Sequence, residues 1–262
     1  MECTYARLVI CIKPVKSSLM GKNSNNLEDE FRINPYELKI LKEIIALKKI
    51  SKLPFILTCV SMGTKSSESV LRRALAMGAD EAVLISDSSF AGSDTVATSY
   101  ILSKAIQKLE NVKFIICGSR SIDGETGQVP AALSERIRYA LYTEVTKICS
   151  FNENNVVFLK DDENKKVLHK GELPAVISYN GFQINDETVS LMALKRAKKK
   201  EIFIMDKDDL NIDVSRCGMT GSKTKVSEVR SSFTKKSGEQ FFGISDETAH
   251  FLTDILRGVH HD

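Results

Sequence analysis

A polar, glycine-rich segment at residues 118–130 carries the residue types best suited to binding a charged ligand. It directly follows an apolar run and ends at Pro130, a residue favoured in the first turn of a helix. Backbone N–H groups at a helix start bind anions, and glycines let the main chain approach a ligand closely. The segment predicts an anion site between a strand and a helix, although plain connecting loops use the same residue types. Its candidate binding residues are Gly118, Ser119, Arg120, Ser121, Ile122, Asp123, Gly124, Glu125, Thr126, Gly127, Gln128 and Val129.

A second hydroxyl-rich segment, residues 90–99, also lies between an apolar run and a helical pattern. Two such helix starts at one edge of a sheet would suit a pyrophosphate, but Ser, Asp and Thr at these positions are also ordinary helix caps. The chain contains no GxGxxG, Walker lysine or GxSxG pattern, which disfavours a standard dinucleotide fingerprint, a P-loop NTPase and a serine hydrolase. The candidate binding residues of this second segment are Gly92, Ser93, Asp94, Thr95 and Thr98.

The elements that must position these segments alternate along the chain. Short apolar runs without alternation predict strands of a parallel sheet covered on both faces, and apolar residues at steps of three and four predict helices between them. We therefore expect an α/β fold with an open, mostly parallel sheet and helices on both faces, of the Rossmann-like or adenine nucleotide alpha hydrolase-like type, with ligands at the carboxyl ends of the strands. The predicted strands are residues 8–12, 54–60, 82–86, 114–117 and 174–179, and the predicted helices begin at Pro35 or span residues 66–77, 94–109 and about 130–139.

The alternation of predicted strands and helices ends after Cys149. Two stretches, residues 156–159 and 166–169, are separated by polar residues and predict a β-hairpin. A polar loop at residues 180–187 then leads into a helical pattern that ends in the densest positive cluster of the chain, residues 195–200. A lysine run of this kind is usually a solvated helix face, so by itself it predicts no partner.

The last part of the chain differs in composition. From residue 206 to about residue 242 the sequence is polar and poor in periodicity, and residues 246–256 show an amphipathic helical pattern. We therefore expect a nucleotide-binding α/β domain at residues 1–205, followed by a C-terminal arm and helix at residues 206–262.

The overall composition is that of an ordinary globular protein. Thirty-seven Lys and Arg against 34 Asp and Glu give a formal charge of +3, which is too small to predict nucleic-acid binding, and 42% of the residues are hydrophobic. The first apolar run, residues 8–12, is too short for a signal peptide or a membrane span, and the six cysteines contain no CxxC pair. We expect a cytoplasmic protein with reduced thiols and without a metal site, a membrane span or a nucleic-acid partner.

Five blocks of the sequence, in order, resemble the beta subunit of electron transfer flavoprotein. The resemblance covers roughly residues 7–205, and the RALAMGADEA and DGETGQV stretches are distinctive together. The five blocks are residues 9–14, 34–37, 60–63, 73–87 and 118–130.

The resemblance implies an adenine-nucleotide-binding fold that pairs with an alpha subunit carrying a redox FAD. In most members the beta subunit holds a structural AMP, and in bifurcating members it holds a second FAD by a GxDTxAT-like loop and a DG(D/E)TxQV loop. This chain has both patterns, at residues 92–99 and 123–129, so it resembles the FAD-holding kind, with Arg120 as a candidate cation for the reduced flavin or its phosphates. Besides the two loops, the resemblance implies nucleotide contacts from Cys11, Asn34, Pro35, Tyr36, Glu37 and Met62.

The resemblance also implies partners. In the family, a loop before an AKKK segment docks an acyl-CoA dehydrogenase through an apolar anchor, and here Leu191 falls at the anchor position before residues 197–200. Residues 185–190 lack the usual Arg and Pro, which leaves the identity of the docking partner open. The C-terminal arm resembles one that lies on the alpha subunit.

Three functions are therefore open. The first is an electron carrier whose beta subunit binds FAD and passes electrons between NADH or an acyl-CoA dehydrogenase and an acceptor, including bifurcation to ferredoxin. The second is a structural AMP-holding subunit, and the third is an adenylate-sensing or adenylate-hydrolysing domain of the same fold. Two flavins per heterodimer would support the first, one flavin and one AMP the second, and ATP turnover by the isolated chain the third.

Overall fold

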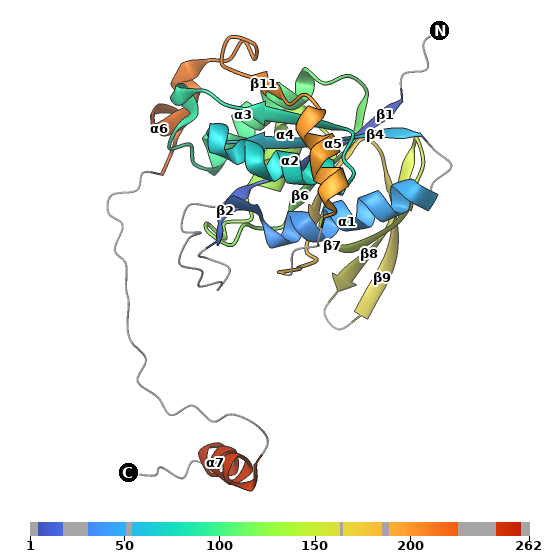
Figure 1. Cartoon of the computed structure of the whole chain (residues 1–262), viewed down its shortest axis with the longest axis vertical. Coiled ribbons are helices and arrows are strands. Elements are labelled where there is room, and N and C mark those ends of the chain that lie inside the picture. The colour runs from blue at the N-terminus through green and yellow to red at the C-terminus, as the bar shows by residue number, and fades with distance from the viewer. Residues whose placement is uncertain are drawn as a thin grey trace. The chain divides into compact units, whose positions relative to one another are not determined.

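A nine-stranded sheet forms the centre of the computed structural model (Figure 1). The structure describes residues 5–17, 31–50, 54–162, 165–184, 189–224 and 245–257. Its strands are β1 (Ala6–Cys11), β4 (Phe55–Met62), β5 (Glu81–Ile85), β6 (Val112–Gly118), β7 (Ala140–Phe151), β8 (Asn155–Asp162), β9 (Lys165–Glu172), β10 (Ala175–Tyr179) and β11 (Phe203–Met205). They are arranged in the order β11-β5-β4-β1-β6-β10-β7-β8-β9, and all neighbours are parallel except β7 with β8 and β8 with β9.

Helices cover both faces of the parallel part of the sheet (Figure 1). Successive residues of β1 pack on opposite faces of the sheet, with Leu8 and Ile10 in one core and Val9 and Cys11 in the other, which explains why the strand is apolar without alternation from residue 8 onward. The first core also contains residues of α1 and α2, and the second contains residues of α3 and α4. The helices are α1 (Pro35–Ile50), α2 (Glu68–Met77), α3 (Thr95–Gln107), α4 (Val129–Ile137), α5 (Leu191–Lys199) and α6 (Gly218–Gly221), with 3-10 turns η2 (Lys65–Ser67), η3 (Ser88–Phe90) and η4 (Val214–Arg216) and a small antiparallel pair, β2 (Pro14–Lys16) and β3 (Phe31–Ile33).

The predicted α/β class is confirmed, and so is the predicted hairpin, which forms β8 and β9. Strands β7 and β11 were not predicted. The twelve residues of β7 mix exposed, half-buried and buried positions, because this strand connects the doubly covered sheet to the antiparallel extension. The predicted helix over residues 130–139 ends at Ile137, where Arg138 takes a left-handed conformation with φ 59°.

Residues 206–224 continue the first of two compact units, which spans Met1–Lys225 and so extends beyond the predicted domain boundary at residue 205. Leu210 and Cys217 are buried there. The carboxylates of Asp206 and Asp213 accept N–H bonds from the residues that follow them, so this polar stretch folds through short turns and shows no helical period. Residues 225–244 of the predicted arm lie outside the described residues, and the predicted terminal helix is α7 (Asp246–Leu256) in the second unit.

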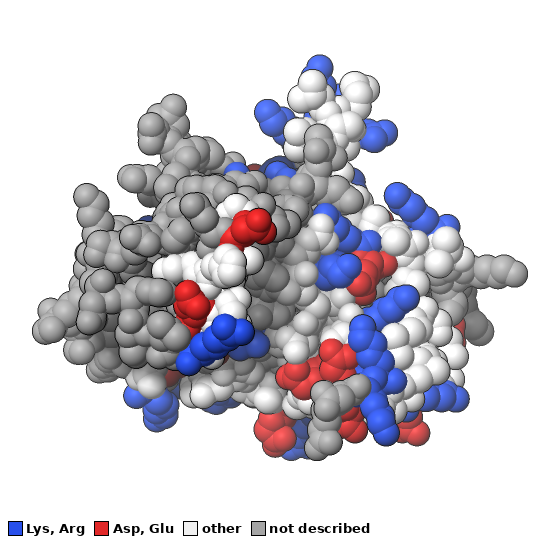
Figure 2. All heavy atoms as spheres, turned by 90° about the horizontal axis from the view of Figure 1, so that it is seen from below, with Lys and Arg blue, Asp and Glu red and all other residues white. Residues whose placement is uncertain are grey.

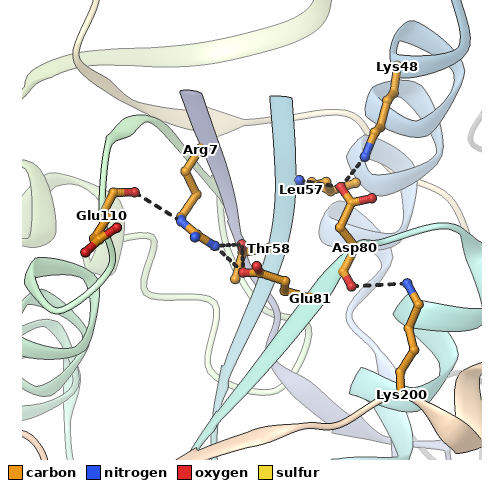
Figure 3. A network of polar contacts seen from close by, with 8 residues as sticks. All are labelled: Arg7, Lys48, Leu57, Thr58, Asp80, Glu81, Glu110 and Lys200. Atoms are coloured by element: carbon orange, nitrogen blue, oxygen red, sulfur yellow. Dashed lines mark hydrogen bonds and ion pairs between the residues drawn. The ribbon is translucent and has the colours of Figure 1, made fainter. Parts of the chain in front are cut away.

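Hydrogen bonds and ion pairs of charged side chains connect neighbouring strands of the sheet near their amino ends (Figure 3). The Arg7 guanidinium donates to the Thr58 hydroxyl at 2.6 Å, forms an ion pair with Glu81 and donates through Nε to the carbonyl of Glu110 at 3.1 Å. Positive and negative side chains are also interspersed over the face shown in Figure 2.

Candidate functional site

The ends of β1, β4 and β6 bring Cys11, Met62 and Gly118 to one edge of the sheet, because these three parallel strands are neighbours. The chain that leaves β1 leads to α1 on one face, and the chain that leaves β6 leads to α4 on the other face. Ligands of open α/β sheets bind at such a switch point, outside the carboxyl ends of the strands. The predicted position of the site therefore agrees with the topology.

Asn34 fixes the 118–129 loop to the segment before α1. Its side chain is fully buried, donates through Nδ2 to the carbonyl of Arg120 at 3.0 Å and accepts the N–H of Ile122 at 3.2 Å. A side-chain amide supplies both a donor and an acceptor without carrying charge. Asn34 thus shapes the loop from beneath.

Arg120 is held over the same segment. Its Nε donates to the Tyr36 hydroxyl at 3.0 Å, and the guanidinium lies 5.9 Å from the centre of the Tyr36 ring. On its other side Tyr36 meets Phe182 edge-to-face at 5.1 Å, while the carbonyl of Pro35 accepts the N–H of Gln183 at 3.3 Å. The motif at residues 34–36 therefore connects the candidate site to the loop after β10.

Lys13 supplies a cation that was not predicted as a site residue. Its Nζ lies 2.6 Å from the carboxylate of Asp123 and 3.2 Å from the hydroxyl of Ser121. Partial burial raises the pKa of Asp123, but the hydrogen bonds from Lys13 and Ser121 outweigh this effect and hold the pKa below its usual range. The ionised pair ties the middle of the loop to the end of β1; the only sequence signal for Lys13 was its place in the block at residues 9–14.

Glu37 is a buried carboxyl group beneath the site. Burial raises its pKa from 4.5 to about 8, against the lowering effect of hydrogen bonds from Asn34 and from the backbone of Lys13 and Gly118. One oxygen, Oε2, has no hydrogen-bond partner among the described residues. The other oxygen occupies the space that a Cβ on residue 118 would need, which explains why this position is a glycine. The family resemblance included Glu37 among the nucleotide contacts but did not predict the raised pKa of its carboxyl group.

The outer part of the 118–129 loop is exposed from Asp123 to Gln128. Glu125 and Gly127 have left-handed φ angles of 51° and 64°, and a Cβ on Gly127 would lie 3.1 Å from the carbonyl of Ser119. Gln128 occupies the N-cap of α4 without a side-chain hydrogen bond to the helix. The first N–H groups of α4 are therefore not bound by their cap residue. The remaining loop residues in this exposed or half-buried stretch are Gly124, Thr126 and Val129.

The two predicted loops meet through Thr95 and Gln128. The Thr95 hydroxyl donates to Oε1 of Gln128 at 2.8 Å, so the starts of α3 and α4 lie side by side. The start of α3 differs from that of α4, because the Asp94 carboxylate accepts the N–H groups of Val96 and Ala97 at 2.9 and 3.0 Å. The capping interpretation of Asp94 is therefore correct, and these two amides are not free for a phosphate.

The C-terminal part of the first unit packs over the 92–95 loop. The second oxygen of Asp94 accepts the N–H groups of Lys223 and Thr224 at 2.6 and 3.0 Å. The Ser93 hydroxyl accepts the N–H of Gly218 at 3.0 Å, and Met219 fills the space beside Gly92. Burial raises the pKa of Asp94, but its backbone hydrogen bonds outweigh this effect and lower the pKa overall. Thr98 lies one turn into α3, where its N–H donates to the carbonyl of Asp94.

The model of the electron transfer flavoprotein domain matches residues 26–210 of the chain. The beta subunit of electron transfer flavoprotein from Thermoanaerobacterium thermosaccharolyticum is 32% identical over 250 residues, which cover 95% of this chain and 93% of that protein. Protein FixA from Azotobacter vinelandii is 35% identical over 242 residues, which cover 84% of this chain and 82% of that protein. The chain belongs to the electron transfer flavoprotein beta-subunit family. A third relative, 28% identical over 97% of the chain and 99% of its own length, is the caffeyl-CoA reductase-Etf complex subunit CarD from Acetobacterium woodii.

The candidate site of this electron transfer flavoprotein subunit has the residue chemistry of an anion-binding site. The uncapped start of α4, the exposed loop amides and the cations Lys13 and Arg120 all lie at the same edge of the sheet. Among the residues that the structure describes, no cluster of three or more His, Cys, Asp and Glu side chains could hold a metal ion. Within the same ranges, no helix has both the length and the apolar character needed to cross a membrane.

Proposed function

We propose that this beta subunit binds FAD at the edge where β1 and β6 end and works within a heterodimeric electron transfer flavoprotein. The observation that carries the proposal is the contact between the exposed 118–129 loop, at the uncapped start of α4, and the 92–95 loop through Thr95. A dinucleotide is long enough to use both loops, whereas the loop before α4 is sufficient for one phosphate group.

The residues of the chain would bind and orient the cofactor. The amides at the start of α4 would face its phosphates, and Arg120, already held by Tyr36, would add positive charge. Because Asp94 occupies the first amides of α3, we expect the 92–95 loop to contribute the Thr95 hydroxyl and close packing instead of phosphate-binding amides. FAD, when bound, supplies electron and hydride transfer, so no acid–base residue of the chain is required.

A structural AMP in the same position, with redox FAD only in the alpha subunit, is the second candidate. It is favoured by the Asp94 carboxylate, because a negative charge at the start of α3 repels a second phosphate there. The two candidates share the loop before α4 and differ in the use of the loop before α3.

We further propose an alpha subunit as partner of the C-terminal arm and α7, and electron exchange with NADH, with an acyl-CoA dehydrogenase-type flavoenzyme, or with ferredoxin by bifurcation. Docking through α5 is supported by Leu191, which begins the helix and is 77% exposed. The name of the Acetobacterium woodii relative, which includes a caffeyl-CoA reductase, supports a partner of this chemistry. A cytoplasmic location suits the free thiols at positions 11, 59, 117, 149 and 217.

Extraction of the nucleotides from the purified heterodimer tests the proposal: two flavins support FAD in this subunit, and one flavin with one AMP contradicts it. A pair of variants sharpens the result. Thr95→Val removes the hydroxyl that joins the two loops, so it should reduce retention of an FAD that uses both loops. Thr146→Val, on strand β7 of the antiparallel extension, is the matched control, and this variant should retain the full nucleotide content.

A further inference from the structure

Helix α5, which carries the proposed docking residue Leu191, has little apolar anchoring of its own. Ala197 is its only buried residue, whereas Leu191 and Met192 are 77% and 65% exposed. Burial of apolar area normally fixes a surface helix to its domain, and one alanine supplies little of it. Other contacts must therefore decide where this helix lies.

The first such contact is made by Arg72 of α2. Its Nη1 donates to the carbonyl of Ala197 at 2.9 Å and to that of Lys200, at the end of α5 where carbonyls lack partners within the helix. Its Nε and Nη2 donate to the carboxylate of Glu68 at 3.0 and 2.8 Å, which orients the guanidinium. A cation at a helix C-terminus also interacts favourably with the helix dipole.

In the second contact, the residue after α5 donates to the segment after α2. Nζ of Lys200, directly after α5, donates to the carbonyls of Ala79 and Asp80 at 2.9 and 3.1 Å, in the turn between α2 and β5 (Figure 3). The Asp80 carboxylate in turn accepts the N–H of Leu57 at 2.7 Å and pairs with Lys48 (Figure 3). The turn that receives Lys200 is therefore itself fixed to β4 and α1.

We propose that Arg72 and Lys200 are positioning residues for partner docking. Arg72 supplies a cation to backbone carbonyls at the end of α5, and Lys200 supplies one to carbonyls in the turn after α2; together they replace the apolar contacts that α5 lacks. Their contacts fix the C-terminal end of α5, and the exposed apolar residues at its N-terminal end are thereby presented at a defined place on the surface. The inference rests on the proposed function for the docking role, whereas the anchoring can be measured without it.

Hydrogen exchange of the intact heterodimer measures the anchoring. Arg72→Gln should speed exchange of the amides in residues 191–200 by about tenfold or more, because charge-assisted bonds to the helix end are lost. Lys39→Gln is the matched control, since it removes another ion pair of i,i+4 spacing, with Glu43 on α1, and should leave exchange in α5 unchanged. Arg72→Lys keeps the charge but only one donor group, so it should restore part of the protection. Unchanged exchange in Arg72→Gln would overturn the inference.

Electron transfer to a purified short-chain acyl-CoA dehydrogenase measures the positioning. Arg72→Gln should raise the KM for the heterodimer severalfold and leave kcat and the nucleotide content unchanged, and Lys200→Gln should act in the same direction. If Leu191→Ala raises the KM but Arg72→Gln does not, the positioning role is wrong. If Leu191→Ala has no effect either, the docking proposal itself has failed, and faster exchange in Arg72→Gln would then identify the anchor as purely structural.

Discussion

Two neighbouring side chains at the start of α1 show how single residues shape the candidate site. Asn34 uses both ends of its amide on the 118–129 loop, and Glu37 lies beneath the same loop with one unpartnered oxygen. A neutral amide is stable in this buried position because both of its groups are bonded, whereas a buried carboxyl group lowers its cost by holding a proton. Asn34 thus determines the shape of the loop, and Glu37 makes the stability of the region beneath the loop depend on pH.

Replacement of Asn34 by Ala should weaken both the fold and the loop. The N–H of Ile122 and the carbonyl of Arg120 would lose their partner in a buried place, which costs about 1–3 kcal/mol. The expected result is a lower denaturation midpoint of the heterodimer and a lower nucleotide content after gel filtration. Asn34→Asp keeps the acceptor but sets a carboxylate oxygen against the carbonyl of Arg120 in a buried place, so it should be at least as destabilising as Asn34→Ala. A wild-type midpoint in Asn34→Ala would show that the loop does not depend on this amide.

The pKa of Glu37 predicts a pH dependence of stability. Its pKa is about 8 in the folded protein against an ordinary value of 4.5, so the folded state holds the proton more strongly. Its contribution is therefore fully present below about pH 4.5 and is lost as the pH rises through about 8, with a slope of up to about 1.4 kcal/mol per pH unit. Glu37→Gln cannot ionise, so its unfolding free energy, measured in urea across this range, should fall less with rising pH. Equal slopes for the two proteins would contradict the prediction.

At the scale of elements, the starts of α3 and α4 are adjacent but chemically different. Asp94 caps α3 and also binds the C-terminal segment, whereas the cap residue of α4 leaves the helix amides available. A phosphate is attracted to the free helix start and repelled by the capped one. The loop before α3 therefore joins the candidate site to the chain that leads toward the C-terminal arm.

Variants of Asp94 should separate its two roles. Asparagine is a good N-cap, so Asp94→Asn should keep the start of α3 protected in hydrogen exchange but speed exchange at residues 223–224, where a carboxylate oxygen is lost. Asp94→Ala should lose the protection of both segments, with a destabilisation of about 1–2 kcal/mol from the cap alone. Equal protection of residues 223–224 in wild type and Asp94→Asn would contradict the tethering role.

At the scale of the whole molecule, the chain consists of an α/β unit and a small C-terminal unit that contains α7. In α7, Leu252 and Leu256 are 54% and 85% exposed. Apolar residues exposed in this way suit an interface, and they accord with the proposal that this unit binds the alpha subunit.

A chain that ends after Thr224 should therefore keep its fold but lose its partner. Residues 206–224 already belong to the first unit, so we expect its thermal unfolding to remain cooperative. Its affinity for the alpha subunit, measured by co-purification and calorimetry, should fall by at least about tenfold, and Leu256→Glu in the full chain should act in the same direction. Unaltered affinity of the truncated chain would assign the interface to the first unit.

The sequence by itself determined the α/β class, the positions of the main strands along the chain and the two loops before α3 and α4, because apolar runs and helix-start residues report local structure and burial on two faces. It also predicted the β8–β9 hairpin, but it did not predict β7, which pairs with that hairpin and mixes exposed, half-buried and buried residues. Only the tertiary structure decided that Lys13 and Asn34 hold the 118–129 loop, that Asp94 also tethers residues 223–224, and that Arg72 holds the end of α5. These contacts join residues far apart in the chain, and their hydrogen bonds and burial depend on distances that no local pattern of residue types contains.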